Sequence, residues 1–279
     1  MDEDNPQGRH GDRDAERPTE LLTPGGSLLD DLLMAIRFYS RLPTGPLPHR
    51  PPDLDRMAIV LPFASFIIGL APALILIGAS LLGLPRLFAA GLAVGAAVLV
   101  SGGMAEDAIA DAADGLFGGT VRERRLEIMK DSRHGTYGVA ALCLFLLLRV
   151  AALSSMTAIE PFSAGAIWLA AMLMARSGAL WLTLALPPAR ASGASAAAGR
   201  VTIAAFGMGT VFALILGLVL SASGAGLIGF VAATTLATAV ALGWTALCRR
   251  LIGGQTGDLI GALQALLEIA ALTGYLLFF

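Results

Sequence analysis

Long apolar segments alternate with polar connectors along most of the chain. Seven such segments follow an N-terminal region of 56 residues. They cover approximately residues 57–82, 87–105, 139–159, 163–187, 202–222, 225–247 and 259–279. An apolar run of about 18 residues or more is long enough to cross a bilayer as a helix. The pattern therefore predicts an all-α, polytopic integral membrane protein with about seven transmembrane helices.

The chain before the first predicted span has two parts. Residues 1–27 are polar, rich in Asp, Arg and Pro, and lack the apolar run of a signal peptide, so we expect a disordered leader. Residues 28–43, LLDDLLMAIRFYSRLP, place several leucines on one helical face with Ile36. This predicts an amphipathic helix at the membrane surface. No second folded domain is indicated, so residues 28–279 are expected to form a single membrane-embedded domain.

Composition supports a membrane protein, and the cations indicate its orientation. Hydrophobic residues make up 56% of the chain and charged residues 14%, whereas soluble proteins carry about 25% charged residues. Three polar connectors are long: residues 106–138, 188–201 and 248–258. If these connectors and the N-terminus are cytoplasmic, only Arg86, Arg149 and Arg176 of the 19 Lys and Arg residues lie elsewhere. The positive-inside rule therefore predicts a cytoplasmic N-terminus and a C-terminus on the opposite side.

The connector 106–138 begins with regularly spaced acids. Asp107, Asp111 and Asp114 follow an i, i+4, i+7 pattern, which places them within an arc of roughly 60° on one helical face. Carboxylates so arranged repel one another unless a cation lies among them, and hard oxygen ligands suit Mg²⁺ or Mn²⁺. A metal site is therefore predicted, because charge at the edge of a membrane span tends to be functional. A solvated acidic helix end is the alternative. Gly115 follows directly, then Gly118 and Gly119, and we expect the helix to end or open at these glycines, where a ligand could approach the backbone.

The same connector continues with a basic segment, RERRLEIMKDSR. Its cations are Arg122, Arg124, Arg125, Lys130 and Arg133. They are suited either to phosphates or to anionic lipid headgroups. Glu127 and Asp131 form a second acidic pair, so a mixed-charge interfacial helix with internal ion pairs is the alternative. His134 has no partner at ligand spacing and is interpreted as a bystander.

Carboxylates for a divalent ion beside a basic segment are the components of phosphoryl transfer. The chain contains no GxxxxGK[ST], which excludes a P-loop enzyme. A transporter would hold its coordinating groups near the bilayer midplane, and a scaffold gives no reason for three aspartates on one face. A membrane enzyme is therefore favoured, and no nucleic-acid partner is expected.

The run GGMAEDAIADAADGLFGGTVRERRLEIMKDSRHGTYG, residues 102–138, closely resembles the signature of the cobalamin synthase family, whose members are adenosylcobinamide-GDP ribazoletransferases. Residues 35–43, 175–190 and 253–270 resemble further blocks in the family's order. The resemblance implies a Mg²⁺-dependent enzyme of the bacterial cytoplasmic membrane with a cytoplasmic active site. It would join adenosylcobinamide-GDP to α-ribazole or α-ribazole 5′-phosphate and release GMP. Membrane lipids, a second copy or other cobalamin-assembly enzymes are expected partners.

Carried over residue by residue, the resemblance implies that Asp107, Asp111 and Asp114 are catalytic metal ligands and that Asp131 is a further ligand. The residues implied in substrate or phosphate binding are Arg41, Arg125, Lys130, Arg133, Arg176 and Asp258. Two assignments stay open. Asp258 is equally suited to capping the final helix, and Arg176 is equally suited to pairing with Glu268 inside the membrane.

This sequence departs from the family pattern at two positions. Ala105 stands where the family usually has a histidine, and Ala108 replaces a usual glycine. Any role that this histidine has in the family therefore cannot be assigned to Ala105. The nearest rival class is the CDP-alcohol phosphotransferases, which use similar metal chemistry. Their pattern has Ala-Arg shortly after Asp-Gly, whereas DGLFGG stands here, and this favours the cobalamin synthase resemblance.

Overall fold

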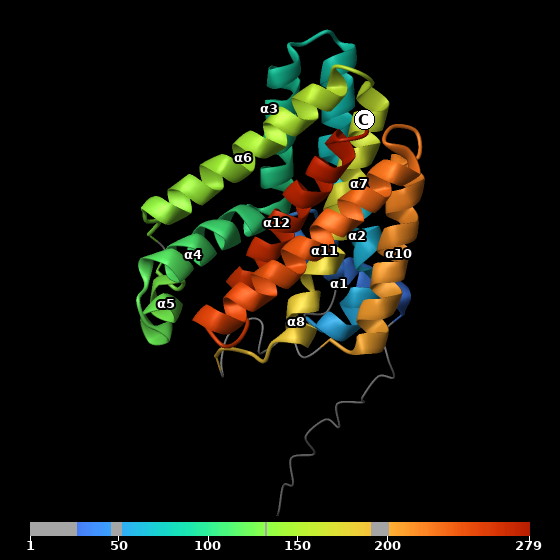
Figure 1. Ribbon diagram of the computed structural model, residues 1–279. Helices are drawn as coiled ribbons and strands as arrows, with labels where there is room; N and C mark the ends of the chain where they lie inside the picture. The colour runs from blue at the N-terminus through green and yellow to red at the C-terminus, as the bar shows by residue number, and fades with distance from the viewer. Residues whose placement is uncertain (1–26, 46–51, 132, 191–200) are drawn as a thin grey trace, which may run out of the picture.

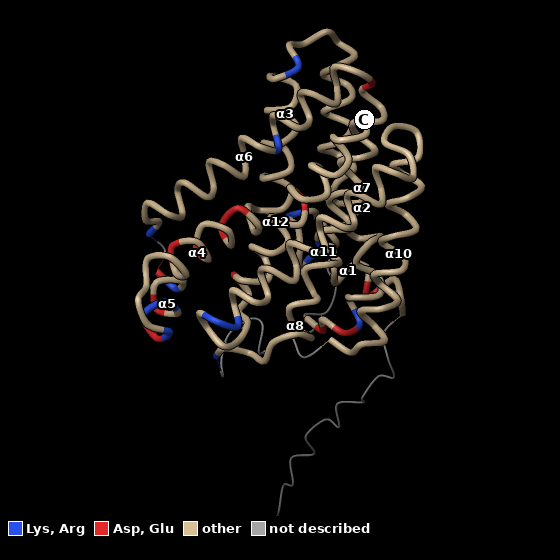
Figure 2. Tube along the Cα trace, in the orientation of Figure 1, with Lys and Arg blue, Asp and Glu red and all other residues tan. Residues whose placement is uncertain are grey.

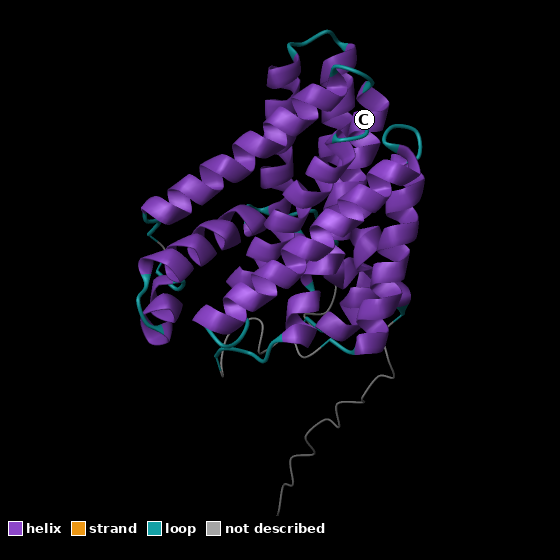
Figure 3. Ribbon diagram, in the orientation of Figure 1, coloured by secondary structure: helices purple, strands orange, loops and turns teal. Residues whose placement is uncertain are grey.

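The computed structural model describes residues 27–45, 52–131, 133–190 and 201–279. Its helices are α1 (Leu28–Tyr39), α2 (Leu54–Leu81), α3 (Arg86–Ser101), α4 (Met104–Gly118), α5 (Arg122–Ile128), α6 (Thr136–Thr157), α7 (Pro161–Ala179), α8 (Trp181–Ala185), α10 (Ile203–Ser221), α11 (Gly226–Leu251) and α12 (Gly257–Leu276). Helices and loops alone make up these ranges (Figure 3), which confirms the all-α prediction. The leader predicted over residues 1–27 lies, apart from Ser27, outside the described residues.

The chain is a polytopic membrane protein. Six helices are long and apolar enough to cross a bilayer, namely α2, α6, α7 continued by α8, α10, α11 and α12. A seventh crossing is formed if α3 and α4 count as one span, and these two helices meet at an angle of 87°. The predicted span over 87–105 is therefore wrong at its end. The helix stops at Ser101 because Gly102 and Gly103 adopt left-handed φ values of 69° and 72°.

α7 is the central helix of the bundle, with α2, α10 and α12 packed around it (Figure 1). In its most apolar window 78% of the residues are buried, against 11% in α11, which lies at the periphery. Small residues permit this close packing. A Cβ atom at Gly69 of α2 would lie 2.7 Å from the Met172 methyl group of α7. α10 and α11 are therefore expected to expose more of their surface to lipid than α7 does.

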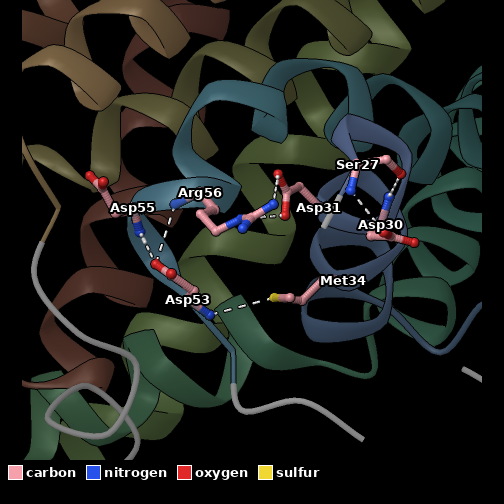
Figure 4. A network of polar contacts seen from close by, with 7 residues as sticks. All are labelled: Ser27, Asp30, Asp31, Met34, Asp53, Asp55 and Arg56. Carbon is pink, nitrogen blue, oxygen red and sulfur yellow. Dashed lines mark hydrogen bonds and ion pairs between the residues drawn. The ribbon is translucent and has the colours of Figure 1, made fainter. Parts of the chain in front are cut away.

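α1 is fixed to the start of α2 by polar contacts (Figure 4). Ser27 and Asp30 form a capping box at the start of α1. Asp31 pairs with Arg56 of α2 at 2.8 Å, and Asp53 caps α2 by accepting hydrogen bonds from two backbone amides. Ile36, on the predicted apolar face, is buried in this contact. The amphipathic helix is confirmed, while its position at a membrane surface stays a prediction.

Charged residues are unevenly distributed along the bundle. Most lie toward the end formed by α5, α8 and the outer part of α4, and few lie at the opposite end (Figure 2). The polar chemistry of the molecule is therefore gathered at one end.

Candidate active site

α4 carries the acidic residues and packs closely on α5. The helix continues through Gly115 but ends at Gly118, with Gly119 as its C-cap, which confirms the expected end at these glycines. Gly115 instead permits close contact with the end of α5. A Cβ atom there would lie 2.9 Å from the Arg125 carbonyl oxygen and would overlap the side chain of Met129. Gly115 therefore allows α4 to pack closely against the end of α5.

Asp107 and Asp111 lie on the open part of α4. Asp107 is exposed, and the Asp111 side chain retains 16% of its exposure. Partial burial, followed by the negative charges of Asp107 and Asp258, raises the pKa of Asp111 to about 6. His134 lies against this carboxylate, with its Nδ1 atom 3.7 Å from the Asp111 Oδ1 atom. His134, interpreted from the sequence as a bystander, therefore lies beside the aspartates of α4.

Asp114 has a different environment from the other two aspartates. It is buried, and its two carboxylate oxygens accept hydrogen bonds from the backbone N–H groups of Gly135 (2.6 Å) and Gly138 (2.8 Å). Both donors lie at the N-terminus of α6, where unpaired N–H groups and the helix dipole favour a negative charge. Asp114 therefore joins α4 to α6, and its oxygens are occupied by protein donors.

Much of the basic segment is engaged with protein groups. Arg125 donates hydrogen bonds to the carbonyl oxygens of Gly119 and Leu251, each at 3.0 Å. Arg122 likewise donates to Ile252 (2.7 Å) and Ala189 (2.9 Å). These two arginines join α5 to the loop after α8 and to the end of α11. The structure thus shows Arg125 bound to backbone carbonyl oxygens, and its contact with phosphate stays a prediction.

The exposed part of that segment contains internal ion pairs. Arg133 binds both oxygens of Asp131 at 3.0 and 2.7 Å, and this contact lowers the pKa of Asp131 to about 2. Glu127 pairs with Arg124 at 2.7 Å. Lys130 is exposed. The structure thus shows the mixed-charge pairs of the alternative interpretation, and it does not bring Asp131 to the aspartates of α4.

Asp258 lies in the first turn of α12, and Thr256 is the N-cap. The capping alternative for Asp258 is therefore wrong. Its carboxylate lies 3.9 Å from Arg190. Two backbone hydrogen bonds hold the preceding loop in place. The Gln255 N–H donates to the Pro187 carbonyl oxygen, and the Gln255 carbonyl oxygen accepts from the Ala189 N–H, each at 2.8 Å. Asp258 is thus positioned by contacts on both sides of the loop.

A cavity of about 240 Å³ lies between α1, α4, α7 and α12. Asp107, Asp258 and Arg176 are its charged lining residues, and Phe38 and Tyr39 supply aromatic surface. This combination of apolar walls and a few polar groups is typical of ligand sites. The cavity is the strongest candidate for the active site, and it unites predicted residues from three separate parts of the sequence.

The two departures from the family pattern lie beside this cavity. Ala108 lines it and faces Gly261 of α12, where a Cβ atom would lie 2.5 Å from the Ala108 Cβ atom. The crossing of α4 and α12 therefore has a small residue on each side. Ala105 lines a smaller neighbouring cavity of about 20 Å³.

A buried ion network links α4, α6 and α12 next to the cavity. Arg149 binds Glu106 at 2.7 Å and Glu268 at 3.0 Å, and Trp168 donates to Glu268 at 2.9 Å. Of the two alternatives left open for Arg176, the direct pair with Glu268 is therefore wrong. Sequence reasoning missed this network, although opposite charges inside apolar segments were a signal that such residues seek partners.

Arg41 lies beside the break between α3 and α4. Its backbone N–H donates to the Val100 carbonyl oxygen at 2.8 Å, and its side chain covers Gly102, where a Cβ atom would lie 2.5 Å from the Arg41 Nε atom. Arg41 therefore packs on the break, and the cavity lining does not include it.

The predicted four-aspartate metal site is not assembled in this structure. Within the described ranges, no three His, Cys, Asp or Glu side chains are grouped closely enough to hold a metal ion. Asp107, Asp111 and Asp258 nevertheless act electrostatically on one another. Mg²⁺ is commonly held by one or two carboxylates together with substrate phosphates and water. The donor set at this end of α4 fits that arrangement without Asp114 or Asp131.

The fold and cavity define a polytopic membrane protein whose polar site is formed by an acidic helix and a buried arginine. The chain belongs to the CobS family, described as cobalamin-5-phosphate synthase, whose model matches residues 31–276. A protein of Azorhizobium caulinodans is 46% identical over 255 residues, covering 90% of this chain and 97% of its own. A protein of Xanthobacter autotrophicus is 45% identical over 258 residues, with coverage of 90% and 97%. Both are named adenosylcobinamide-GDP ribazoletransferase. No solved structure matches the chain.

Proposed function

We propose that this protein is an adenosylcobinamide-GDP ribazoletransferase of vitamin B12 nucleotide-loop assembly. The observation that carries the proposal is the family match over residues 31–276, supported by relatives of that name that are 46% and 45% identical. The same observation gives no support to a CDP-alcohol phosphotransferase. The cavity beside α4 provides a site with suitable chemistry.

In the proposed reaction, a ribose hydroxyl of α-ribazole or its 5′-phosphate attacks the phosphorus on the cobinamide side of the diphosphate. The hydroxyl loses its proton, a new P–O bond forms, and GMP leaves with the electrons of the broken P–O bond. Asp107 and Asp111 would hold the Mg²⁺ ion, with Asp258 nearby. When bound, Mg²⁺ would neutralise charge on the diphosphate.

The other residues would position this site. Asp114 fixes α4 against α6 through the Gly135 and Gly138 amides. Lys130 and Arg133 lie on the exposed surface, where they would attract the anionic substrate. We place the protein in a bacterial cytoplasmic membrane with the N-terminus and the cavity on the cytoplasmic side, in accordance with the distribution of cations.

The test uses the full chain reconstituted in lipid vesicles with adenosylcobinamide-GDP, α-ribazole or its 5′-phosphate, and Mg²⁺. GMP release and cobalamin formation are followed for wild type, Asp111→Asn and the exposed control Arg86→Gln. We expect metal-dependent product that EDTA and Asp111→Asn abolish and that Arg86→Gln retains. Folded wild-type protein that forms no cobalamin but consumes a CDP-alcohol would refute the proposal.

A further inference from the structure

Arg176 of α7 is a buried cation with unsatisfied hydrogen-bond donors. It is 5% exposed, and its Nε and Nη1 atoms have no hydrogen-bond partner among the described residues. Its guanidinium lies 5.5 Å from the ring of Tyr39, which covers a face of the cation but accepts no conventional hydrogen bond. Unpaired buried donors of a charged group are costly, so this arginine requires an explanation.

The neighbouring glutamates do not provide that explanation. Glu106 and Glu268 are both bound by Arg149. Their remaining charge attracts Arg176 without direct contact. The small cavity between these groups, about 20 Å³ in volume, holds about one water molecule. One water can satisfy only one or two of the five guanidinium N–H donors.

The larger cavity is the second space that the Arg176 side chain borders. Arg176 lines this cavity of about 240 Å³ together with Asp107 and Asp258. A cation and two carboxylates across one cavity suit a group that binds an arginine fork on one side and a divalent ion on the other. A phosphoryl group meets both requirements, because its oxygens accept bidentate arginine hydrogen bonds and coordinate Mg²⁺.

We propose that Arg176 binds phosphoryl oxygens of the substrate in this cavity and is a substrate-binding residue. The inference rests on the proposed function for the identity of the substrate. Two phosphoryl groups meet the description, namely the diphosphate of adenosylcobinamide-GDP and the 5′-phosphate of a phosphorylated ribazole. Phe38 and Tyr39 line the cavity on the side of α1, and this apolar surface strengthens polar contacts between a bound group and Arg176.

The first experiment measures binding of inorganic pyrophosphate to the purified full chain in the presence of Mg²⁺, without turnover. It compares wild type, Arg176→Gln, Arg176→Lys and the control Arg86→Gln. We expect Arg176→Gln to weaken binding about 10- to 100-fold, as the loss of charge-assisted hydrogen bonds predicts. Arg176→Lys keeps the charge but not the fork, so we expect an intermediate loss. Arg86→Gln should match wild type.

Wild-type affinity in a folded Arg176→Gln protein would overturn the proposal. If that variant does not fold, wild-type affinity in Arg176→Lys would overturn it. A lysine keeps the positive charge but cannot form the two parallel hydrogen bonds of a guanidinium, so Arg176 would then only balance charge. Absence of ribazoletransferase activity in wild type, with pyrophosphate binding still lost in the variants, would refute the proposed function and leave the phosphoryl site standing.

The second experiment identifies the source of the phosphoryl group. It measures kcat/KM with α-ribazole and with α-ribazole 5′-phosphate for wild type and Arg176→Gln. An equal loss with both acceptors assigns Arg176 to the diphosphate. A loss confined to the phosphorylated acceptor assigns it to the 5′-phosphate. Unchanged kcat/KM with both acceptors would contradict a substrate-binding role.

Discussion

Asp111 and Asp114 are one helical turn apart on α4, yet their surroundings are opposite. Asp114 is buried and accepts two backbone N–H groups, so its negative charge is stabilised by the protein. Burial, followed by the like charges of Asp107 and Asp258, raises the pKa of Asp111 to about 6. The protein stabilises one carboxylate and leaves the other in excess negative potential, which favours a cation there.

Asp114 is therefore expected to contribute mainly to stability. Asp114→Asn removes one acceptor oxygen and places amide hydrogens against the N-terminus of α6. We expect the free energy of unfolding to fall by about 1–2 kcal/mol, measured as a lower unfolding temperature in detergent. Asp107→Asn is the control, because Asp107 is exposed. Equal unfolding temperatures for Asp114→Asn and wild type would contradict the capping role.

Asp111 is expected to oppose stability while supporting activity. Its pKa is about 6 in the folded protein and about 3.9 in an unfolded chain. The folded state thus binds the proton more tightly, and stability falls as pH rises from about 4 to 6. Without divalent ions at pH 7, Asp111→Asn should raise the free energy of unfolding by roughly 1–2 kcal/mol, discounted for solvent screening.

The measurement is the unfolding temperature at pH 7 with EDTA or with Mg²⁺. We expect Mg²⁺ to stabilise wild type but not Asp111→Asn, because ligand binding to the folded state raises its stability. A variant that is less stable than wild type in EDTA would show that the Asp111 charge is already compensated within the protein.

At the scale of the elements, α4 is held by contacts at both ends. Asp114 binds the start of α6, and Glu106 reaches Arg149 in the middle of α6. Arg149 also binds Glu268, so the same cation connects α4 to α12. The break at Gly102 and Gly103 lets α4 turn away from α3. These contacts set the position of Asp107 and Asp111 relative to Asp258.

Arg149 is expected to be essential for this arrangement. Arg149→Met leaves two buried glutamates without a cation, and removing one partner of a buried ion pair costs about 3–5 kcal/mol. We expect a large drop in unfolding temperature and loss of activity. The triple variant Glu106→Gln/Arg149→Met/Glu268→Gln removes all three charges and should regain most of the lost stability. A single variant as stable as wild type would show that the glutamates are neutral or solvated.

The periodicity of the sequence predicted which residues lie on one helix, but it did not predict which residues of other helices they contact. The spacing of Asp107, Asp111 and Asp114 placed them correctly on one helix, because helical spacing is local. The role of Asp114 depends on Gly135 and Gly138, more than twenty residues away, and spacing does not contain that information. The partner of Glu268 was likewise decided by the packing of α6 against α12.

At the scale of the whole molecule, the directions of the helices determine the number of crossings. In Figure 1, α1 lies near the end opposite to the C-terminus, and α2 and α6 run in the same direction. The chain must therefore return between them through α3 and α4. α3 has 16 residues, a length of about 24 Å, which is less than the hydrocarbon thickness of about 30 Å. The bent pair of α3 and α4 would make this return together as one broken span.

Seven crossings place the two termini on opposite sides of the membrane, whereas six place them on the same side. We predict that a membrane-impermeant thiol reagent added outside intact cells labels Arg86→Cys and a cysteine appended after Phe279, but labels Arg124→Cys only after the membrane is opened. Cys143 and Cys248 are first replaced by alanine. If Arg124→Cys is instead labelled from outside together with Arg86→Cys, and the appended cysteine is protected, then α3 and α4 form a re-entrant pair. The acidic helix and the basic segment would then lie on the side opposite to the N-terminus, against the positive-inside rule.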